Sequence, residues 1–154
     1  MKYILIMFFC LFSTCYGQVY VPTVYNELFH IYCTEYGVPS DIMAKLIQYE
    51  SGWNFRTVNK NKNGTKDYGL CQLNSAGLYD LQRWHNNGKP FDPFNWKENL
   101  RIGIKHMRYL YQETGSWWSA VAAYNMGLHG FNEWILGKRK LPETTRNELN
   151  FIFK

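Results

Sequence analysis

Glu50 is the residue of this chain best placed to do chemistry. Met43, Leu46 and Ile47 precede it at the spacing that puts all four side chains on one face of a helix. A carboxyl group at the end of an apolar stripe loses solvation for its charged form, so its pKa rises and it can hold a proton near neutral pH. Such a group is a general acid of the kind that cleavage of a glycosidic bond requires.

A second carboxyl group follows at Asp67, after a polar stretch that contains Asn63-Gly64. This dipeptide suits the positive φ angles of a tight turn, so we expect a short β-hairpin directly after the Glu50 helix. Two interpretations of Asp67 stay open. It stabilises the turn as an Asx residue, or it serves as a nucleophile or ion stabiliser beside Glu50.

Helices must position these residues, and the apolar periodicity predicts most of them. One runs from after Pro22 to Gly37, and the Glu50 helix begins with Ser40 as its N-cap. A short helix capped by Asn74 or Ser75 reaches Trp84. The most regular pattern is carried by Leu100, Ile104, Met107 and Tyr111, between a cap at Asn95 and a stop at Gly115.

The last third of the chain is also predicted to be helical. Ser116 caps a helix that carries Tyr124 and ends at Gly127 and Gly130, and the tail from Phe131 forms one or two short helices. The fold class predicted from all segments is mainly α, with one short β-hairpin.

The amino terminus has the pattern of a secretory signal peptide. Met1-Lys2 supplies the charge, Ile4 to Phe12 form an apolar run too short to span a bilayer, and Ser13 to Gly17 form the small and polar region before cleavage. We expect residues 1–17 to be a signal peptide and residues 18–154 to be one domain without a transmembrane anchor. The expected location is the periplasm or the medium.

The composition of the chain limits which kinds of partner, metal site and disulfide it can have. The 154 residues, 46% of them hydrophobic, suffice for one core. The formal net charge is +5, but the one dense basic run is Lys138-Arg139-Lys140, so we expect a solvated basic surface and no nucleic acid partner. The four histidines show no ligand spacing, and we expect neither a metal nor a cofactor. Outside the signal peptide, Cys33 and Cys71 form a disulfide or remain two buried thiols.

Four motifs in chain order resemble those of the soluble lytic transglycosylase family. They are Glu50-Ser51, Gly69-Leu70-Cys71-Gln72-Leu73-Asn74, Asp92-Pro93-Phe94-Asn95 leading to Asn99-Leu100-Arg101-Ile102-Gly103, and Ala123-Tyr124-Asn125-Met126-Gly127. The resemblance spans about Val38 to Gly130. It implies a lysozyme-like α+β fold of the small single-domain type associated with secretion machines, with a groove for peptidoglycan glycan strands.

Carried over residue by residue, the resemblance makes Glu50 the catalytic acid and base. The substrate-binding residues that it implies are Ser51, Gln72, Asn74, Tyr124 and Asn125. The implied reaction cleaves the β-1,4 bond between N-acetylmuramic acid and N-acetylglucosamine and leaves a 1,6-anhydro-muramic end. Two positions depart from the family, which usually has Met at Cys71 and a small residue at Met126.

A second resemblance overlaps the first. Glu50-Ser51-Gly52-Trp53-Asn54 and the segment from Asp67 to Ser75 are similar to animal-type lysozymes, in which an acid Glu is partnered by an Asp. This alternative implies a glycoside hydrolase that uses Glu50 and Asp67. A glycan-binding or structural component of a secretion apparatus is the other alternative. The motifs after Asn74 match only the transglycosylases, so we expect the anhydro product.

Overall fold

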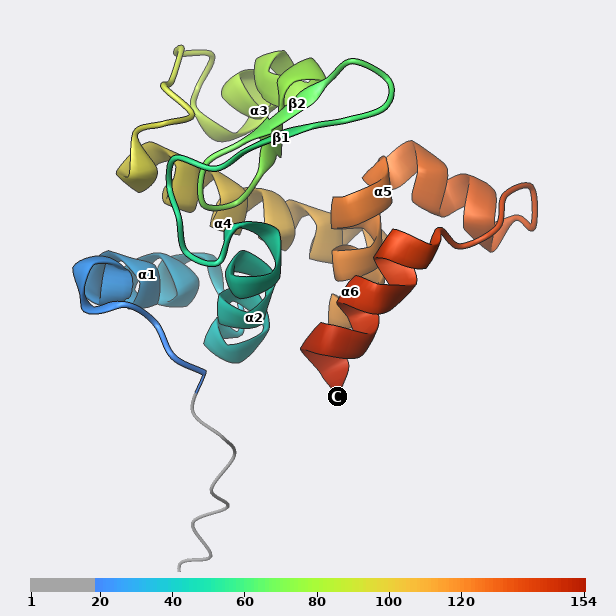
Figure 1. Cartoon of the computed structure of the whole chain (residues 1–154), viewed down its shortest axis with the longest axis horizontal. Coiled ribbons are helices and arrows are strands. Elements are labelled where there is room, and N and C mark those ends of the chain that lie inside the picture. Colours follow the sequence, from blue (N-terminus) through green and yellow to red (C-terminus); the bar gives the residue numbers. More distant parts are fainter. Residues whose placement is uncertain (1–18) are drawn as a thin grey trace, which may run out of the picture.

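Helices dominate residues 19–154, the part of the chain that the computed structural model describes (Figure 1). The predicted signal peptide, residues 1–17, lies outside this part. The mainly α prediction is confirmed. The helices are α1 (Thr23–Tyr36), α2 (Ser40–Ser51), α3 (Leu78–His85), α4 (Trp96–Thr114), α5 (Trp117–Ile135) and α6 (Glu143–Phe153), and a single 3-10 turn, η1 (Ser75–Gly77), precedes α3.

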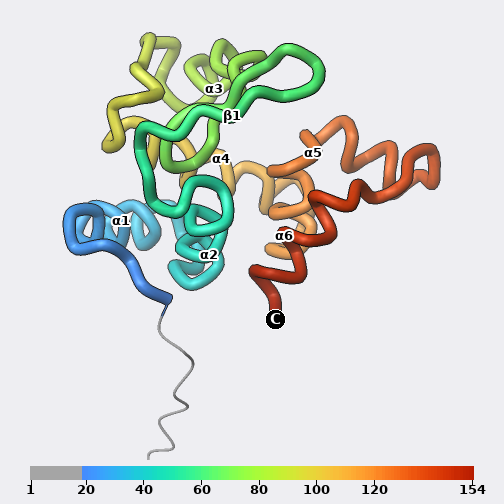
Figure 2. Tube along the Cα trace, viewed as in Figure 1, coloured from blue at the N-terminus to red at the C-terminus, as the bar shows by residue number. Residues whose placement is uncertain are grey.

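Helix α4 holds the domain together. It packs against α1, α3 and α5, while α6 packs against both α2 and α5 (Figures 1 and 2). The predicted stripe of α4 is the reason, because Leu100, Ile104 and Met107 are completely buried. The stripe of α2 is buried in the same core. The Glu50 end of α2 is therefore fixed by packing and not by a flexible loop.

A small antiparallel sheet follows α2, as the hairpin prediction expects. Strands β1 (Val58–Lys60) and β2 (Lys66–Tyr68) form the hairpin, and β3 (Leu73–Asn74) adds a third strand to β2 that was not predicted. In this register Asp67 lies opposite Asn74. Cross-strand neighbours are close enough for their side chains to interact, so β3 decides the surroundings of Asp67.

Most helix ends follow the predicted caps. The Asn95 side chain accepts a hydrogen bond from the Lys97 N–H, and the Ser116 hydroxyl accepts one from the Ser119 N–H. Gly115 ends α4 with a left-handed φ of 79°. The prediction for Ser40 is wrong, because the N-cap is Pro39 and Ser40 is already the first helical residue.

Helix α5 departs from its predicted end. The helix was expected to stop at Gly127 and Gly130, but it continues to Ile135 across a kink at Gly127. This glycine has φ 73° and ψ 151°, a conformation that is essentially restricted to glycine. The kink lies directly after Tyr124 and Asn125, so it separates the residues that resemble a family motif from the second half of the helix.

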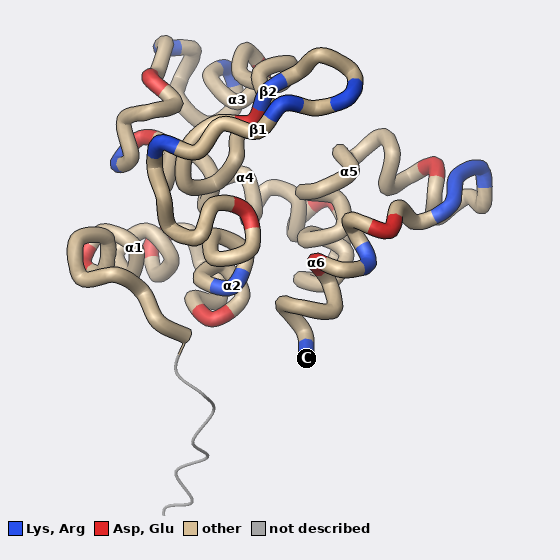
Figure 3. The backbone as a smooth tube through the Cα atoms, viewed as in Figure 1, with Lys and Arg blue, Asp and Glu red and all other residues tan. Residues whose placement is uncertain are grey.

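Basic residues are spread over several elements, with groups around the β1–β2 turn and between α5 and α6 (Figure 3). Within residues 19–154, no helix has the length and apolar character needed to cross a bilayer.

Candidate active site

Glu50 lies near the carboxyl end of α2, where Gly52 closes the helix in a left-handed conformation with φ 58°. Its side chain is half-buried. Its pKa is raised from 4.5 to about 7, mainly by burial and also by the charge of Asp67, while a hydrogen bond with Glu148 opposes the shift. The sequence predicts this upward shift, and burial is indeed its main cause. The side chain can therefore hold a transferable proton at neutral pH.

Ser51 ties the end of α2 to the segment that follows the hairpin. Its single hydroxyl proton is shared between the backbone carbonyls of Leu70, at 2.8 Å, and Ile47, at 3.3 Å. The hydroxyl is thus occupied within the protein. It fixes the position of Glu50 relative to the Gly69–Asn74 loop, while the predicted contact of Ser51 with substrate stays a prediction.

The Gly69–Asn74 loop is held against α4 by Asn99, which is completely buried. The side chain of Asn99 accepts a hydrogen bond from the Cys71 N–H and donates to the carbonyls of Tyr68 and Pro93, each at 2.9 Å. A methyl group on Gly69 would collide with the Asn99 amide. The loop is therefore packed tightly against α4 at this point, and Asn99 is a structural residue of the site.

Gln72 is buried in this loop with a left-handed φ of 46°. Its amide nitrogen donates hydrogen bonds to the carbonyls of Gly69, at 2.8 Å, and Thr57, at 3.2 Å. Its side-chain oxygen is buried and lacks a partner. One acceptor of Gln72 is consequently left for another group, while its nitrogen joins the loop to the residues just before β1.

Asp67 is clamped between two asparagines. Asn61 donates to one carboxylate oxygen at 2.7 Å, and Asn74 donates to the other at 2.6 Å. The turn itself is stabilised by Asn63, whose side-chain oxygen accepts hydrogen bonds from the N–H and hydroxyl of Thr65. The Asx prediction for Asp67 is therefore wrong in its geometry. Asp67 braces the hairpin from within β2, close enough to Glu50 to raise its pKa.

The side-chain amide of Asn74 is hydrogen-bonded within the protein. Its nitrogen donates to Asp67 and to the Thr65 hydroxyl, and its oxygen accepts from the Ala76 N–H as the cap of η1. Every polar atom of this side chain thus has an intramolecular partner. The structure uses Asn74 to hold Asp67 and to begin η1, while its predicted contact with substrate stays a prediction.

Tyr124 and Asn125 approach the site from α5. The Tyr124 hydroxyl donates to the Cys71 carbonyl at 2.7 Å, and burial raises the pKa of this hydroxyl well above its ordinary value. The charge of Glu50 adds to that shift, so the two side chains lie near each other. Asn125 is exposed and accepts a hydrogen bond from the Thr145 hydroxyl at 2.6 Å, which links α5 to α6.

Glu148 is the site residue that sequence reasoning missed. It belongs to α6, is completely buried, and its carboxyl group is in contact with that of Glu50. The signal was available, because Thr145, Leu149 and Ile152 lie on the same face as Glu148 by helical spacing. A carboxyl group on the apolar side of a helix is unusual enough to indicate a special function.

The two cysteines are free and buried. Burial raises the pKa of Cys33 to about 12 and that of Cys71 well above its ordinary value. Cys71 packs against Gly103 of α4, where any larger residue would collide with its sulfur. Of the two arrangements left open by the sequence, the structure has two thiols. In the described residues no three His, Cys, Asp or Glu side chains form a group able to hold a metal ion.

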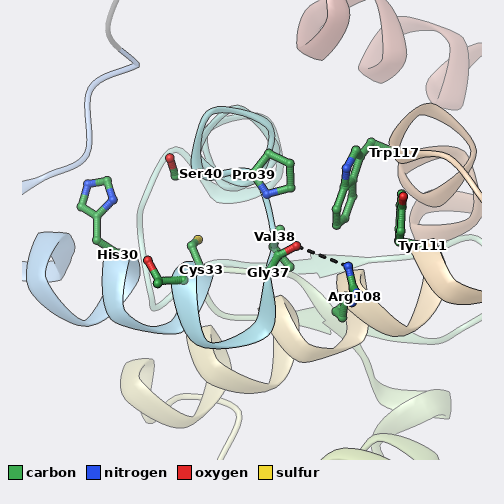
Figure 4. A pocket seen from close by; sticks show the side chains of 10 residues that line it. His30, Cys33, Gly37, Val38, Pro39, Ser40, Arg108, Tyr111 and Trp117 are labelled. Carbon is green, nitrogen blue, oxygen red and sulfur yellow. Dashed lines mark hydrogen bonds between the residues drawn. The ribbon is translucent and has the colours of Figure 1, made fainter.

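A pocket of about 460 Å³ lies elsewhere, between α1, the start of α2, the end of α4 and the start of α5 (Figure 4). Arg108 and Trp117 help to line it, and the ring of Trp117 stacks on Tyr111 with 4.1 Å between centroids. None of the predicted site residues lines this pocket. It is therefore distinct from the site around Glu50 and Glu148.

Comparison with known proteins points to one family. The family model described as Transglycosylase SLT domain matches residues 27–147. Protein IpgF of Shigella flexneri is 32% identical over 94 residues, which are 60% of this chain and 60% of IpgF. The soluble lytic murein transglycosylase of Escherichia coli (strain K12) is 26% identical over 121 residues, which are 74% of this chain and 18% of that protein.

Solved structures share the fold. The 70-kDa soluble lytic transglycosylase, solved in complex with bulgecin A, matches 85% of this chain with a TM-score of 0.70 and 23% identity. An inactive mutant of lytic transglycosylase Slt from Pseudomonas aeruginosa matches the same share with a TM-score of 0.65 and 20% identity. In both cases the match covers 23% of the larger chain. The predicted lysozyme-like fold class is thereby confirmed.

Proposed function

The chain belongs to the Transglycosylase SLT domain family, and we propose that it is a lytic transglycosylase that cleaves peptidoglycan glycan strands. The observation that carries the proposal is the Glu50 carboxyl, which burial keeps protonatable near pH 7 at the surface of the site. The bond cleaved is the β-1,4 bond between N-acetylmuramic acid and N-acetylglucosamine. Ser51, Gln72, Asn74, Tyr124 and Asn125 are the proposed surroundings of the sugars.

In the proposed reaction one carboxyl group serves twice. Glu50 gives its proton to the glycosidic oxygen, the bond from this oxygen to the muramic C1 breaks, and the muramic 2-acetamido group stabilises the cation. The Glu50 carboxylate then removes the proton of the muramic 6-hydroxyl, whose oxygen bonds to C1. The product ends in a 1,6-anhydro ring, and Glu50 is protonated again. No water is consumed.

Asp67 favours a second candidate function, a lysozyme-type glycoside hydrolase. Its carboxylate is fixed by Asn61 and Asn74, and its charge reaches Glu50. In this reaction Asp67 forms a bond to C1 or stabilises the cation, and water then adds to C1. The product is a reducing end that is one water heavier than the anhydro end.

The proposed location follows from the substrate. Peptidoglycan lies outside the inner membrane, so the function requires export, which the pattern of residues 1–17 supports. We therefore place the mature protein, residues 18–154, in the periplasm or the medium. A secretion or envelope-spanning machine is a further proposed partner, supported by the resemblance to the small secretion-associated transglycosylases.

Mass spectrometry of digested peptidoglycan tests both candidate functions. The wild type should release muropeptides with 1,6-anhydro ends, and Asp67→Asn should retain much of this activity because its amide oxygen still accepts one of the two hydrogen bonds that hold the hairpin. Glu50→Gln should lose about 10²–10⁴-fold or more, because the amide keeps the shape but lacks the transferable proton. Exposed Glu143→Gln on α6 is the control.

Three outcomes of this experiment are informative. Reducing ends together with an inactive Asp67→Asn would replace the transglycosylase by the hydrolase. Full activity of Glu50→Gln would remove Glu50 from both mechanisms. Absence of any cleavage by the folded wild type would contradict an enzymatic function and favour a glycan-binding or structural component.

A further inference from the structure

The environment of Glu148 disfavours the ionised form of its carboxyl group. None of its surface is exposed, and neither carboxylate oxygen has an ordinary hydrogen-bond donor. Thr145, Leu149 and Ile152, its neighbours on the same face of α6, are also buried. Burying an unpaired carboxylate costs several kcal/mol, which is why such a group normally takes up a proton.

The groups that face Glu148 carry no positive charge. They come from every element around it: Tyr49 and Glu50 from α2, Asp67 from β2 by way of Glu50, Tyr124 and Asn125 from α5, and Thr145 from α6 itself. Within residues 19–154 the single ion pair is His129 with Glu133. No lysine or arginine of the described part therefore neutralises Glu148.

Contact between two carboxyl groups requires a proton. Two carboxylates are both acceptors and repel each other, whereas one carboxylic acid can donate to one carboxylate. Burial is the largest influence and, with the charge of Glu50, raises the pKa of Glu148 to about 9, while Asn125 opposes this shift. Glu50 has the lower pKa, about 7. Glu148 is thus the member of the pair that keeps its proton when Glu50 gives its proton away.

We propose that Glu148 is a buried, neutral carboxylic acid that donates a hydrogen bond to Glu50 and stabilises the carboxylate formed when Glu50 protonates its substrate. Glu148 is a positioning residue in this proposal, since it acts through Glu50 and its own proton stays in place. The part that concerns catalysis rests on the proposed function. The protonation of Glu148 in the folded protein does not.

The first test needs no substrate. A carboxyl group whose pKa is raised in the folded protein stabilises the fold fully below its unfolded pKa, and this stability is lost as the pH rises through the folded value. The unfolding equilibrium constant of the wild type, relative to that of Glu148→Gln, should therefore rise by up to about tenfold per pH unit between about pH 5 and 8. Chemical denaturation of both proteins at each pH measures this ratio.

The matched control for this test is Glu143→Gln, an exposed glutamate on the same helix. Its unfolding constant should follow the wild type at every pH. If Glu148→Gln also runs parallel to the wild type, Glu148 is ionised in the folded protein and the proposal is overturned. If Glu148→Gln does not fold, infrared titration of the wild-type carboxyl groups decides, because a neutral acid band should persist at pH 8, above the pKa of Glu50, and be absent there if the proposal is wrong.

The second test measures catalysis. Glu148→Leu removes the donor, so the pKa of Glu50 should rise, the alkaline limb of the pH–rate profile should move upward, and the rate should fall about 10- to 100-fold, the worth of a hydrogen bond to a charged group. Glu148→Gln should recover most of that loss, since an amide still donates. Equal losses in both variants with an unmoved pH profile would mean that Glu148 only packs.

The two tests separate the two claims. If the wild type is inactive but the pH dependence of its unfolding still indicates a protonated Glu148, only the proposed function is contradicted. If the wild type is active but Glu148 is ionised in the folded protein, only the inference about Glu148 is contradicted.

Discussion

At the scale of single residues, the environment gives different properties to three carboxyl groups that lie near one another. Glu50 is half-buried and has a pKa of about 7, Glu148 is completely buried and has a pKa of about 9, and Asp67 is held by two amide donors. Burial and the partners of each group make these differences, since the three have nearly the same intrinsic chemistry. Glu50 combines partial exposure with a proton that it can lose near neutral pH.

Tyr124→Phe tests the hydrogen bond that joins α5 to the Gly69–Asn74 loop. The change leaves the carbonyl of the fully buried Cys71 without its donor. We expect the free energy of unfolding to fall by about 1–3 kcal/mol, and cleavage to weaken because the loop carries Gln72. Urea denaturation measures the first effect. Tyr79→Phe, at an exposed tyrosine, is the control; an equally stable Tyr124→Phe would mean that this bond contributes nothing.

Residue chemistry was partly predictable from sequence. Glu50 could be found because its pKa shift follows from local helical spacing. The clamp on Asp67 could not, because Asn74 reaches it through the pairing of β2 with β3, which only the folded sheet defines. Spacing alone also places Glu148 on the buried face of α6, yet its partner lies 98 positions earlier in the chain, and periodicity carries no information about that contact.

At the scale of elements, prediction succeeded where the signals are local. The caps at Asn95 and Ser116 satisfy neighbouring N–H groups, so the sequence within a few residues decides them. Strand β3 escaped prediction because two residues show no periodicity. The continuation of α5 beyond Gly127 was missed for a different reason. Glycine often ends a helix, and here tertiary packing sustains a second segment after the kink.

Gly127→Ala tests the kink. Alanine is strained at φ 73° and ψ 151°, while the space around the position is open, so the penalty belongs to the backbone alone. We expect a loss of about 1–3 kcal/mol in the free energy of unfolding. Gly77→Ala is the matched control, since Gly77 also has open space but a φ of −93°. A loss of similar size in both variants would refute the backbone explanation.

At the scale of the whole molecule, the site depends on the packing of distant segments. Helix α6 reaches α2 and α5, and the Lys45 ammonium donates to the Ile152 carbonyl at 2.8 Å, which fastens the last turn of α6 to α2. This packing brings Glu148 to Glu50, and it buries Glu148 completely and Glu50 in part. A second pair is formed by His85, at the end of α3, and His106 of α4, with 3.2 Å between ring nitrogens, and His106 also contacts the ring of Tyr124.

The two pairs should limit the stability of the molecule from opposite sides of the pH scale. Burial lowers the pKa of His85 to about 4 and that of His106 to about 3, from an ordinary value of 6.5. Below pH 6.5 these two histidines therefore bind protons in the unfolded chain but not in the folded protein, so the free energy of unfolding decreases as the pH falls. The carboxyl pair acts in the opposite sense, since its stability is lost as the pH rises toward about 7 and then 9.

His106→Gln tests the acid side of this balance. Glutamine can still form a hydrogen bond with His85 but does not titrate. As the pH falls from about 6.5 to 4, the unfolding constant of the variant should therefore rise less steeply than that of the wild type. The difference is up to about tenfold per pH unit, because the unfolded variant binds one proton fewer. The alkaline limb should keep its slope, because the carboxyl pair is untouched. Denaturation at each pH, with exposed His129→Gln as the control, measures both limbs. An unchanged acid limb would show that the histidine pair is already protonated in the folded protein.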